Sequence, residues 1–171
     1  MGEENHFVAE FYHRLWPWID HGPSLSFCLD DGGTGKSSTP DVCFRFAGQA
    51  KTTRIECKIL YLKKGNNKKK NHIRVYPKQL LSWASADCEV TPHLWVAKGE
   101  GAEKYFVWSH DNQVFLENLE TAAEGVEHGD KRGELVKVPD EITGGPLTFA
   151  GMFFRVWQIA IEKHLLAMEM R

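Results

Sequence analysis

Three residues in the first half of the chain have the types and spacing to perform chemistry together: Asp41, Glu56 and Lys58. Asp41 comes directly before a short apolar run at residues 42–46, and Glu56 and Lys58 lie inside a second such run. Side chains alternate between the two faces of a strand, so Glu56 and Lys58 share one face and Cys57 lies on the other. If the two runs pair as neighbouring strands, two carboxylates and an ammonium group come together.

Such a group of charges is suited to a divalent cation and a phosphate. Two carboxylates repel each other unless a cation lies between them, and Mg²⁺ prefers oxygen ligands of this kind. A lysine close to the metal can orient or deprotonate a water and balance the charge of a phosphate in the transition state. We therefore expect Mg²⁺, with Mn²⁺ as a substitute. The alternative is an ordinary surface hairpin that carries an exposed Glu–Lys pair.

The order Pro40-Asp41, a spacer and Glu56-Cys57-Lys58 resembles the PD-(D/E)xK nuclease superfamily, which includes many type II restriction enzymes and the archaeal Holliday-junction resolvases. The resemblance implies a metal-dependent DNA endonuclease that hydrolyses phosphodiester bonds. Asp41 and Glu56 would bind the metal, together with the backbone carbonyl of Cys57. Lys58 would position or activate the attacking water and stabilise the charge of the transition state.

The expected elements follow the order helix, three strands, helix, strand, strand. An amphipathic helix is predicted over residues 3–16, with Pro17 as its stop, because Phe7, Phe11 and Leu15 recur at helical spacing. The other predicted elements are strands at 24–29, 42–46, 53–62, 93–97 and 105–109 and a helix at 77–87. This order is similar to the αβββαβ core of the superfamily. The resemblance implies a restriction-endonuclease-like α/β fold, with a mixed central sheet flanked by helices.

Two further side chains are implied by the resemblance as catalytic residues. Members of the superfamily often carry a glutamate on the first helix, and Glu10 matches as an additional or water-mediated metal ligand. The alternative for Glu10 is a solvated ion pair with Arg14, four residues further along the helix. Gln79, in the first turn of the helix at 77–87, would orient water or phosphate as in the resolvase-like branch. The alternative for Gln79 is an exposed glutamine at a helix start.

Two polar loops are the expected contacts to DNA. Five lysines occupy the eight residues 63–70, within a predicted surface loop at 63–72 that directly follows the Glu-x-Lys strand. Neutralising phosphates is the natural use of such a loop, and simple solvation is the alternative. The Gly/Ser/Lys segment 33–38 is no nucleotide-binding P-loop, because Asp30 stands where the first glycine is required. It is expected to contact a DNA phosphate or to form a flexible turn. The predicted DNA-contacting residues are Lys36, Ser37, Lys63, Lys64, Lys68, Lys69 and Lys70.

Composition favours one globular domain over all 171 residues. The resemblance covers a core at about 5–110 and leaves an extension at 111–171. The net charge of −2 gives no global signature of nucleic-acid binding, so any such signal is local. The four cysteines lack close pairing, which favours reduced core residues of an intracellular, cytoplasmic protein. No membrane span is expected, and a homodimer is implied by the resemblance.

The sequence of the extension, residues 111–171, says less about its structure and function. Short strands are possible interpretations of residues 114–116 and 135–138, and a wide apolar helix is expected at 148–170. Charged residues interrupt that last helix too often for a membrane span. Two other functions stay open. The chain could be a catalytically inactive nuclease-like domain that binds nucleic acid or a protein partner, or a metal-free structural protein.

Overall fold

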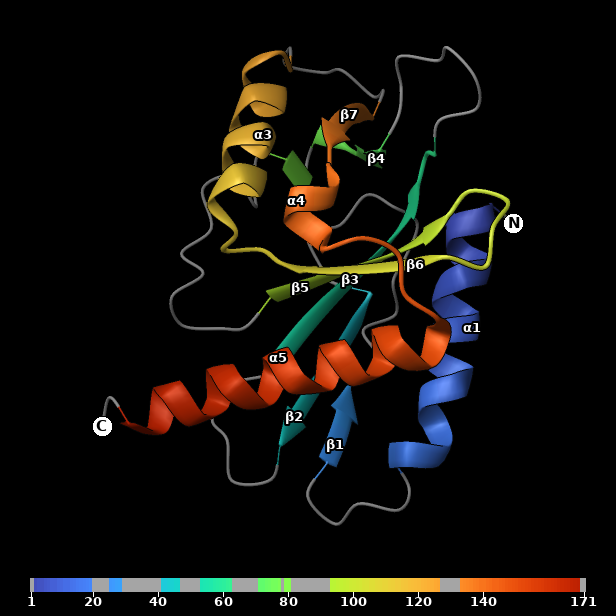
Figure 1. The fold of residues 1–171 in the computed structure, drawn as a ribbon, viewed down its shortest axis with the longest axis vertical. Helices are drawn as coiled ribbons and strands as arrows, with labels where there is room; N and C mark the ends of the chain where they lie inside the picture. Colours follow the sequence, from blue (N-terminus) through green and yellow to red (C-terminus); the bar gives the residue numbers. More distant parts are fainter. Residues whose placement is uncertain are drawn as a thin grey trace.

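The computed structural model describes residues 2–19, 25–28, 41–46, 53–62, 71–77, 79–80, 93–126 and 133–169. Helices and strands of the described residues form a mixed α/β arrangement (Figure 1). The helices are α1 (Glu3–Ile19), α3 (Gln113–Glu124), α4 (Asp140–Thr143) and α5 (Phe149–Glu169). The strands are β1 (Leu25–Cys28), β2 (Val42–Phe46), β3 (Thr53–Leu60), β4 (His72–Val75), β5 (His93–Gly99), β6 (Tyr105–Ser109) and β7 (Glu134–Lys137).

A five-stranded mixed sheet is the centre of the fold, with the strand order β1-β2-β3-β5-β6. β3 and β5 are parallel, and the other neighbouring strands are antiparallel. β4 and β7 form a separate two-stranded antiparallel sheet. The expected mixed sheet with flanking helices is therefore present. Strands β3, β5 and β6 bury side chains on both faces, which explains their long runs of apolar residues.

The two faces of the sheet pack against different elements. Helices α1 and α5 cover one face, where alternate residues of the strands meet the apolar sides of both helices. This first core contains Phe7, Phe11, Val42, Ile55, Cys57, Ile59, Leu94, Val96, Tyr105, Val107, Met152, Val156 and Ala160. The residues between them in β3, β5 and β6 point to the opposite face. The second core contains Leu60, Ile73, Val75, Leu80, Trp95, Ala97, Phe106, Trp108, Phe115, Leu119, Val136, Val138 and Ile142.

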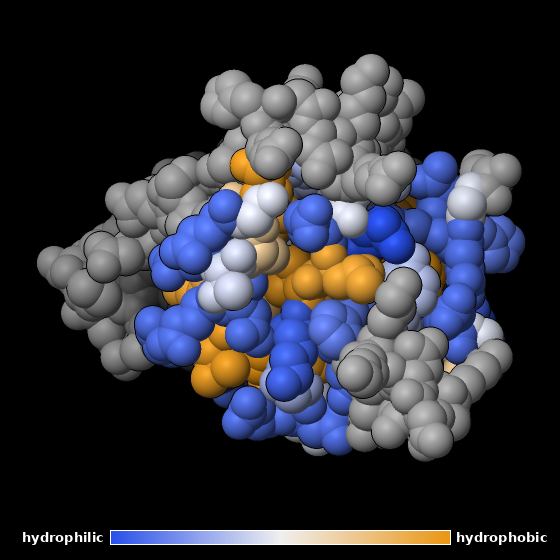
Figure 2. All heavy atoms as spheres, turned by 90° about the horizontal axis from the view of Figure 1, so that it is seen from above, coloured by the Kyte–Doolittle hydropathy of each residue, from blue (hydrophilic) through white to orange (hydrophobic). Residues whose placement is uncertain are grey.

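The second core lies at the end of the molecule that carries α3, β4 and β7 (Figure 1). Figure 2 views this end and shows apolar side chains framed by hydrophilic ones. Leu62, Leu116 and Val126 are partly buried apolar residues that pack against this core. No helix of the described residues is long and apolar enough to cross a membrane.

The N-terminal half departs from the prediction in three places, the smallest of which is that β3 ends at Leu60, two residues before its expected end. Helix α1 continues past Pro17 to Ile19, so the expected stop at Pro17 is wrong. A proline removes one backbone donor, and this loss costs less when only a few residues of the helix follow. His72 was expected in a surface loop but begins β4, in which Ile73 and Val75 are buried. With only two inward-facing apolar residues, the alternation of apolar and polar residues is too short to distinguish this strand from the polar loop before it.

The C-terminal half departs from the prediction in two further places. Residues 114–116 belong to helix α3, so a strand there is wrong. The side chain of Asn112 accepts a hydrogen bond from the Phe115 backbone N–H at 3.1 Å, and this N-cap starts the helix. Strand β5 reaches Gly99, two residues beyond its expected end. The strand at 134–137 and the helix at 149–169 match the predicted elements to within one residue.

Candidate functional site

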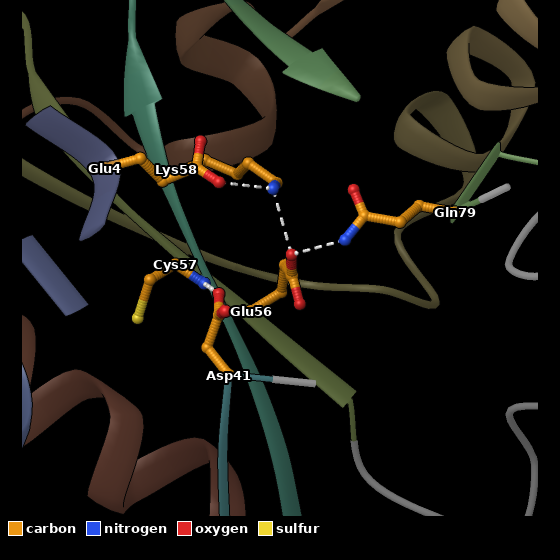
Figure 3. Close-up of polar contacts among 6 residues, drawn as sticks. All are labelled: Glu4, Asp41, Glu56, Cys57, Lys58 and Gln79. Atoms are coloured by element: carbon orange, nitrogen blue, oxygen red, sulfur yellow. Dashed lines mark hydrogen bonds and ion pairs between the residues drawn. The ribbon is translucent and has the colours of Figure 1, made fainter. Parts of the chain in front are cut away.

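Pairing of β2 with β3 places the acid that precedes β2 beside the Glu-x-Lys segment of β3. The register aligns Val42 with Ile55, so Asp41 lies where the pairing ends. The carboxylate of Asp41 accepts a hydrogen bond from the Cys57 backbone N–H at 2.8 Å. Asp41 therefore bonds to β3 through its side chain, at the point where the backbone hydrogen bonds between β2 and β3 end. Its carboxylate is held against β3 (Figure 3).

Lys58 is enclosed by carboxylates from two elements (Figure 3). Its Nζ lies 3.0 Å from Glu56 Oε1, two residues away on the same face of β3. It also donates to Glu4 Oε1 at 2.9 Å, from the first turn of α1. The ammonium group therefore ties the N-terminal end of α1 to the central strand of the sheet.

Gln79 completes the set from a different segment of the chain. Its Nε2 donates to Glu56 Oε1 at 3.1 Å, so this oxygen receives both an amide and an ammonium donor. The structure places Gln79 beside Glu56, so the alternative of an exposed glutamine is wrong, and the expected role of Gln79 toward water or phosphate stays a prediction. Pro77, Gln79 and Leu80 are helical, whereas residue 78 and residues 81–87 of the expected helix lie outside the described residues.

Burial separates this arrangement from a surface hairpin. Glu56 and Lys58 are each 1% exposed, and Gln79 is 4% exposed. Lysine and glutamate are almost never fully buried unless they are paired. The alternative of an exposed Glu–Lys pair is therefore wrong. Three carboxylates (Glu4, Asp41 and Glu56) lie around one ammonium group, so the site has an excess of negative charge when all four groups are ionised.

That excess, together with burial, changes the proton affinity of the acids. Burial raises the pKa of Glu56 to about 8; Lys58 opposes this rise and Asp41 adds to it. Burial likewise raises the pKa of Asp41 to about 6, against the charge of Lys58 and the hydrogen bond from Cys57. Both carboxyls are easier to protonate than in water, because burial disfavours their charged forms more strongly than the Lys58 ammonium group favours them.

Lys58 shows the opposite balance. Burial alone would lower its pKa, but Glu56, Glu4 and Asp41 outweigh burial and hold the pKa of Lys58 above its ordinary value. The side chain therefore stays an ammonium ion at neutral pH. It can donate hydrogen bonds and stabilise negative charge, but it cannot take a proton from water.

The donor atoms fit a hard cation. Glu56 Oε2 and Gln79 Oε1 are buried and accept no hydrogen bond from any described residue. The N–H and C=O of one residue in an extended strand point to the same edge, so the Cys57 carbonyl faces the edge on which Asp41 lies. No group of three or more His, Cys, Asp or Glu side chains among the described residues is arranged to hold a metal. Mg²⁺ is commonly bound through only one or two carboxylates and completes its shell with waters, so Asp41 and Glu56 are the residues that could hold it.

Glu10 does not lie in this cluster. Its carboxylate pairs with Arg14 at 2.9 Å and with Lys98 at 3.7 Å. The pair with Arg14 is the alternative that the sequence analysis gave for Glu10. The acid that α1 contributes is Glu4, which the sequence analysis had not assigned to the site. A signal was present, because Glu4 lies three and seven residues before Phe7 and Phe11 and so continues the stripe of α1 that faces the sheet.

The predicted DNA-contacting residues lie outside the described part of the chain. These are Lys36, Ser37, Lys63, Lys64, Lys68, Lys69 and Lys70. Their assignment stays a prediction from the sequence.

Comparisons of the chain with family models, with curated proteins and with solved structures gave no match.

Proposed function

We propose that this chain is a Mg²⁺-dependent deoxyribonuclease that hydrolyses phosphodiester bonds at the cluster of Asp41, Glu56, Lys58 and Gln79. One observation carries the proposal: Lys58 is buried beside Asp41 and held between two carboxylates, 3.0 Å from Glu56 and 2.9 Å from Glu4. A purely structural core gains little from such a group, because burying an ion pair costs desolvation that its attraction barely offsets. Clusters of strongly perturbed acids and bases are typical of reacting sites.

The residues of the chain would divide the work as follows. Lys58, as a permanent ammonium ion, would stabilise negative charge that develops on the phosphate, and would orient water by donation. Gln79 holds Glu56 Oε1 through its amide, which leaves Glu56 Oε2 for another partner. Asp41 and Glu56, with the Cys57 carbonyl, would hold the metal. A bound Mg²⁺ would supply charge neutralisation at the non-bridging oxygens and the leaving oxygen.

The direct test is an activity assay with the intact chain. Supercoiled plasmid, linear duplex, single-stranded and branched DNA are each incubated with Mg²⁺, with Mn²⁺ and with excess chelator. Cleavage of at least one substrate in either metal, abolished by the chelator, is the expected result. Binding of DNA without cleavage in any of these conditions would replace the enzyme by a nucleic-acid-binding module.

The structure adds a role for Glu4 that can be tested separately. We expect Glu4→Gln to lower the turnover rate about 10-fold, the lower end of the effect of removing a side chain that orients a reacting group. KM should change little, because Glu4 holds Lys58 and not the substrate. Glu4→Asp should restore part of the rate.

Glu3→Gln is the matched control for this variant. Glu3 lies in the same turn of α1, is exposed, and contacts only the Gly101 N–H, at 3.5 Å, among the described residues. Equal rates for the Glu3 and Glu4 variants would show that Glu4 has no part in positioning Lys58.

A further inference from the structure

The face of β3 that carries Glu56 and Lys58 begins with a third charged residue, Arg54. Positions 54, 56 and 58 alternate with the apolar residues 55, 57 and 59, which belong to the first core. All eight residues of β3 are described, and Arg54 is the single exposed one. The row therefore starts with an accessible guanidinium and continues into buried acidic and basic groups.

Arg54 forms no ion pair with a carboxylate among the described residues. Within the described residues, no Asp or Glu lies at ion-pair distance from its guanidinium. Its partner in the parallel register is His93 of β5, one step before the pair of Glu56 with Trp95. Burial lowers the pKa of His93 to about 3, and the charges of His110 and Arg54 add to this effect. His93 is therefore neutral at neutral pH and leaves Arg54 as the cation of this pair.

The spacing of the row suits a phosphate chain. Residues two apart on a strand lie roughly 6.6 Å apart, so Arg54 begins one such step from Glu56 and two from Lys58. Phosphates of one DNA strand follow each other every 3.4 Å or so along the helix axis, so one step of the row spans about two of them. A guanidinium at this distance reaches a phosphate one or two positions from the reacting one, and its planar fork matches phosphate oxygens in bidentate geometry.

We infer that Arg54 binds a phosphate of the DNA strand that flanks the scissile phosphate, and so positions the strand along β3. This inference rests on the proposed nuclease function and names a contact that function requires. Arg54 binds a group that does not react, so its contribution is to affinity and not to the chemical step. Loss of such uniform binding raises KM and leaves kcat unchanged.

The experiment compares Arg54→Gln with Arg155→Gln. Arg155 is exposed on α5, next to Val156 of the first core, and so lies across the sheet from the Glu56 row. Both variants lose one charge of the same kind. Affinity for a short labelled duplex is measured at several salt concentrations with Ca²⁺ in place of Mg²⁺, and kcat and KM are measured with Mg²⁺. Thermal unfolding of each variant checks that the fold is kept.

Arg54→Gln is expected to weaken duplex binding and raise KM by about 10-fold, the scale of one charged hydrogen-bonded contact. The slope of log affinity against log salt should fall by roughly 0.9, the value for one lost phosphate contact. Arg54→Lys should keep the slope and lose part of the affinity. Arg155→Gln should match the wild type in each measurement.

If the wild type cleaves DNA but the two glutamine variants have equal affinity, slope and KM, the role of Arg54 is overturned while the nuclease function stands. An unchanged KM with a lower kcat in Arg54→Gln would also overturn it, because the contact would then act on the chemistry. If the wild type neither binds nor cleaves any DNA, the nuclease function and the role of Arg54 fall together.

Discussion

Replacement of Lys58 by alanine should lower the rate of DNA cleavage by a factor on the order of 10² or more. This is the usual scale for removing one electrostatic donor or general base from an active site. The raised pKa of Lys58 makes it a cation throughout the neutral range, so the lost contribution is charge stabilisation and water orientation. Binding of DNA in Ca²⁺ should fall far less, since one lysine adds little to the total phosphate contact.

Lys98→Ala is the matched control for this substitution. Lys98 lies on β5, is 17% exposed in its side chain, and pairs with Glu10 and Glu103. It follows Ala97 of the second core, so it faces the other side of the sheet from Lys58. Lys98→Ala should therefore cleave at the wild-type rate. If Lys58→Ala lowers binding and cleavage by the same factor, Lys58 only anchors DNA.

Loss of the fold would also abolish cleavage, so a second variant separates the two causes. Lys58→Met keeps most of the buried length of the side chain and removes the charge together with the N–H donors. Unfolding of both variants is followed by heating. Cleavage that is lost in Lys58→Met, at a melting temperature close to that of the wild type, assigns the effect to the ammonium group.

The proximity of Asp41, Glu56 and Lys58 could be predicted from the sequence because strand geometry is local. A period of two places Glu56 and Lys58 on one face, and pairing of two short apolar runs brings Asp41 to Cys57, where the structure has a 2.8 Å hydrogen bond. The burial of Glu56 and Lys58 could not be predicted from the sequence. It depends on residues distant in sequence, such as Gln79 and the first turn of α1, that close over β3.

The exchange of Glu10 for Glu4 illustrates the same limit on a helix. Both acids lie on α1, and the resemblance to nucleases pointed to Glu10 from its place in the sequence. Which acid reaches the site depends on how α1 lies across the sheet: its N-terminal end is next to Lys58, so the first turn makes the contact. Glu10 lies more than one turn further along and meets Arg14 and Lys98 instead.

Replacement of Asp41 by asparagine should abolish metal-dependent cleavage and leave the fold intact. The change removes one charge and almost no volume, and the amide oxygen of asparagine can still accept the hydrogen bond from the Cys57 N–H. Asp140→Asn, at an exposed aspartate in the first turn of α4, is the matched control and should keep full activity. Full activity of Asp41→Asn, or of the wild type in excess chelator, would contradict the proposed metal site.

The same variant gives a pH-dependent change of stability whose sign follows from the pKa of Asp41. The unfolded chain releases this proton near the ordinary pKa of 3.8, whereas the folded protein, without metal, holds it up to about 6. Across this window the folded state binds more protons, so the free energy of unfolding falls as the pH rises. Asparagine has no such proton and escapes this loss.

In chelator, Asp41→Asn should therefore match the wild type below about pH 4 and be the more stable protein above about pH 6. Loss of the Asp41 charge also lowers the pKa of Glu56, which acts in the same direction. Addition of Mg²⁺ should reverse the order, because a ligand that binds only the folded state stabilises the wild type and not the variant. Melting temperatures measured from pH 4 to pH 8, with and without Mg²⁺, provide the check. A wild type that melts above the variant at pH 8 in chelator would mean that the Asp41 charge is stabilising without any cation.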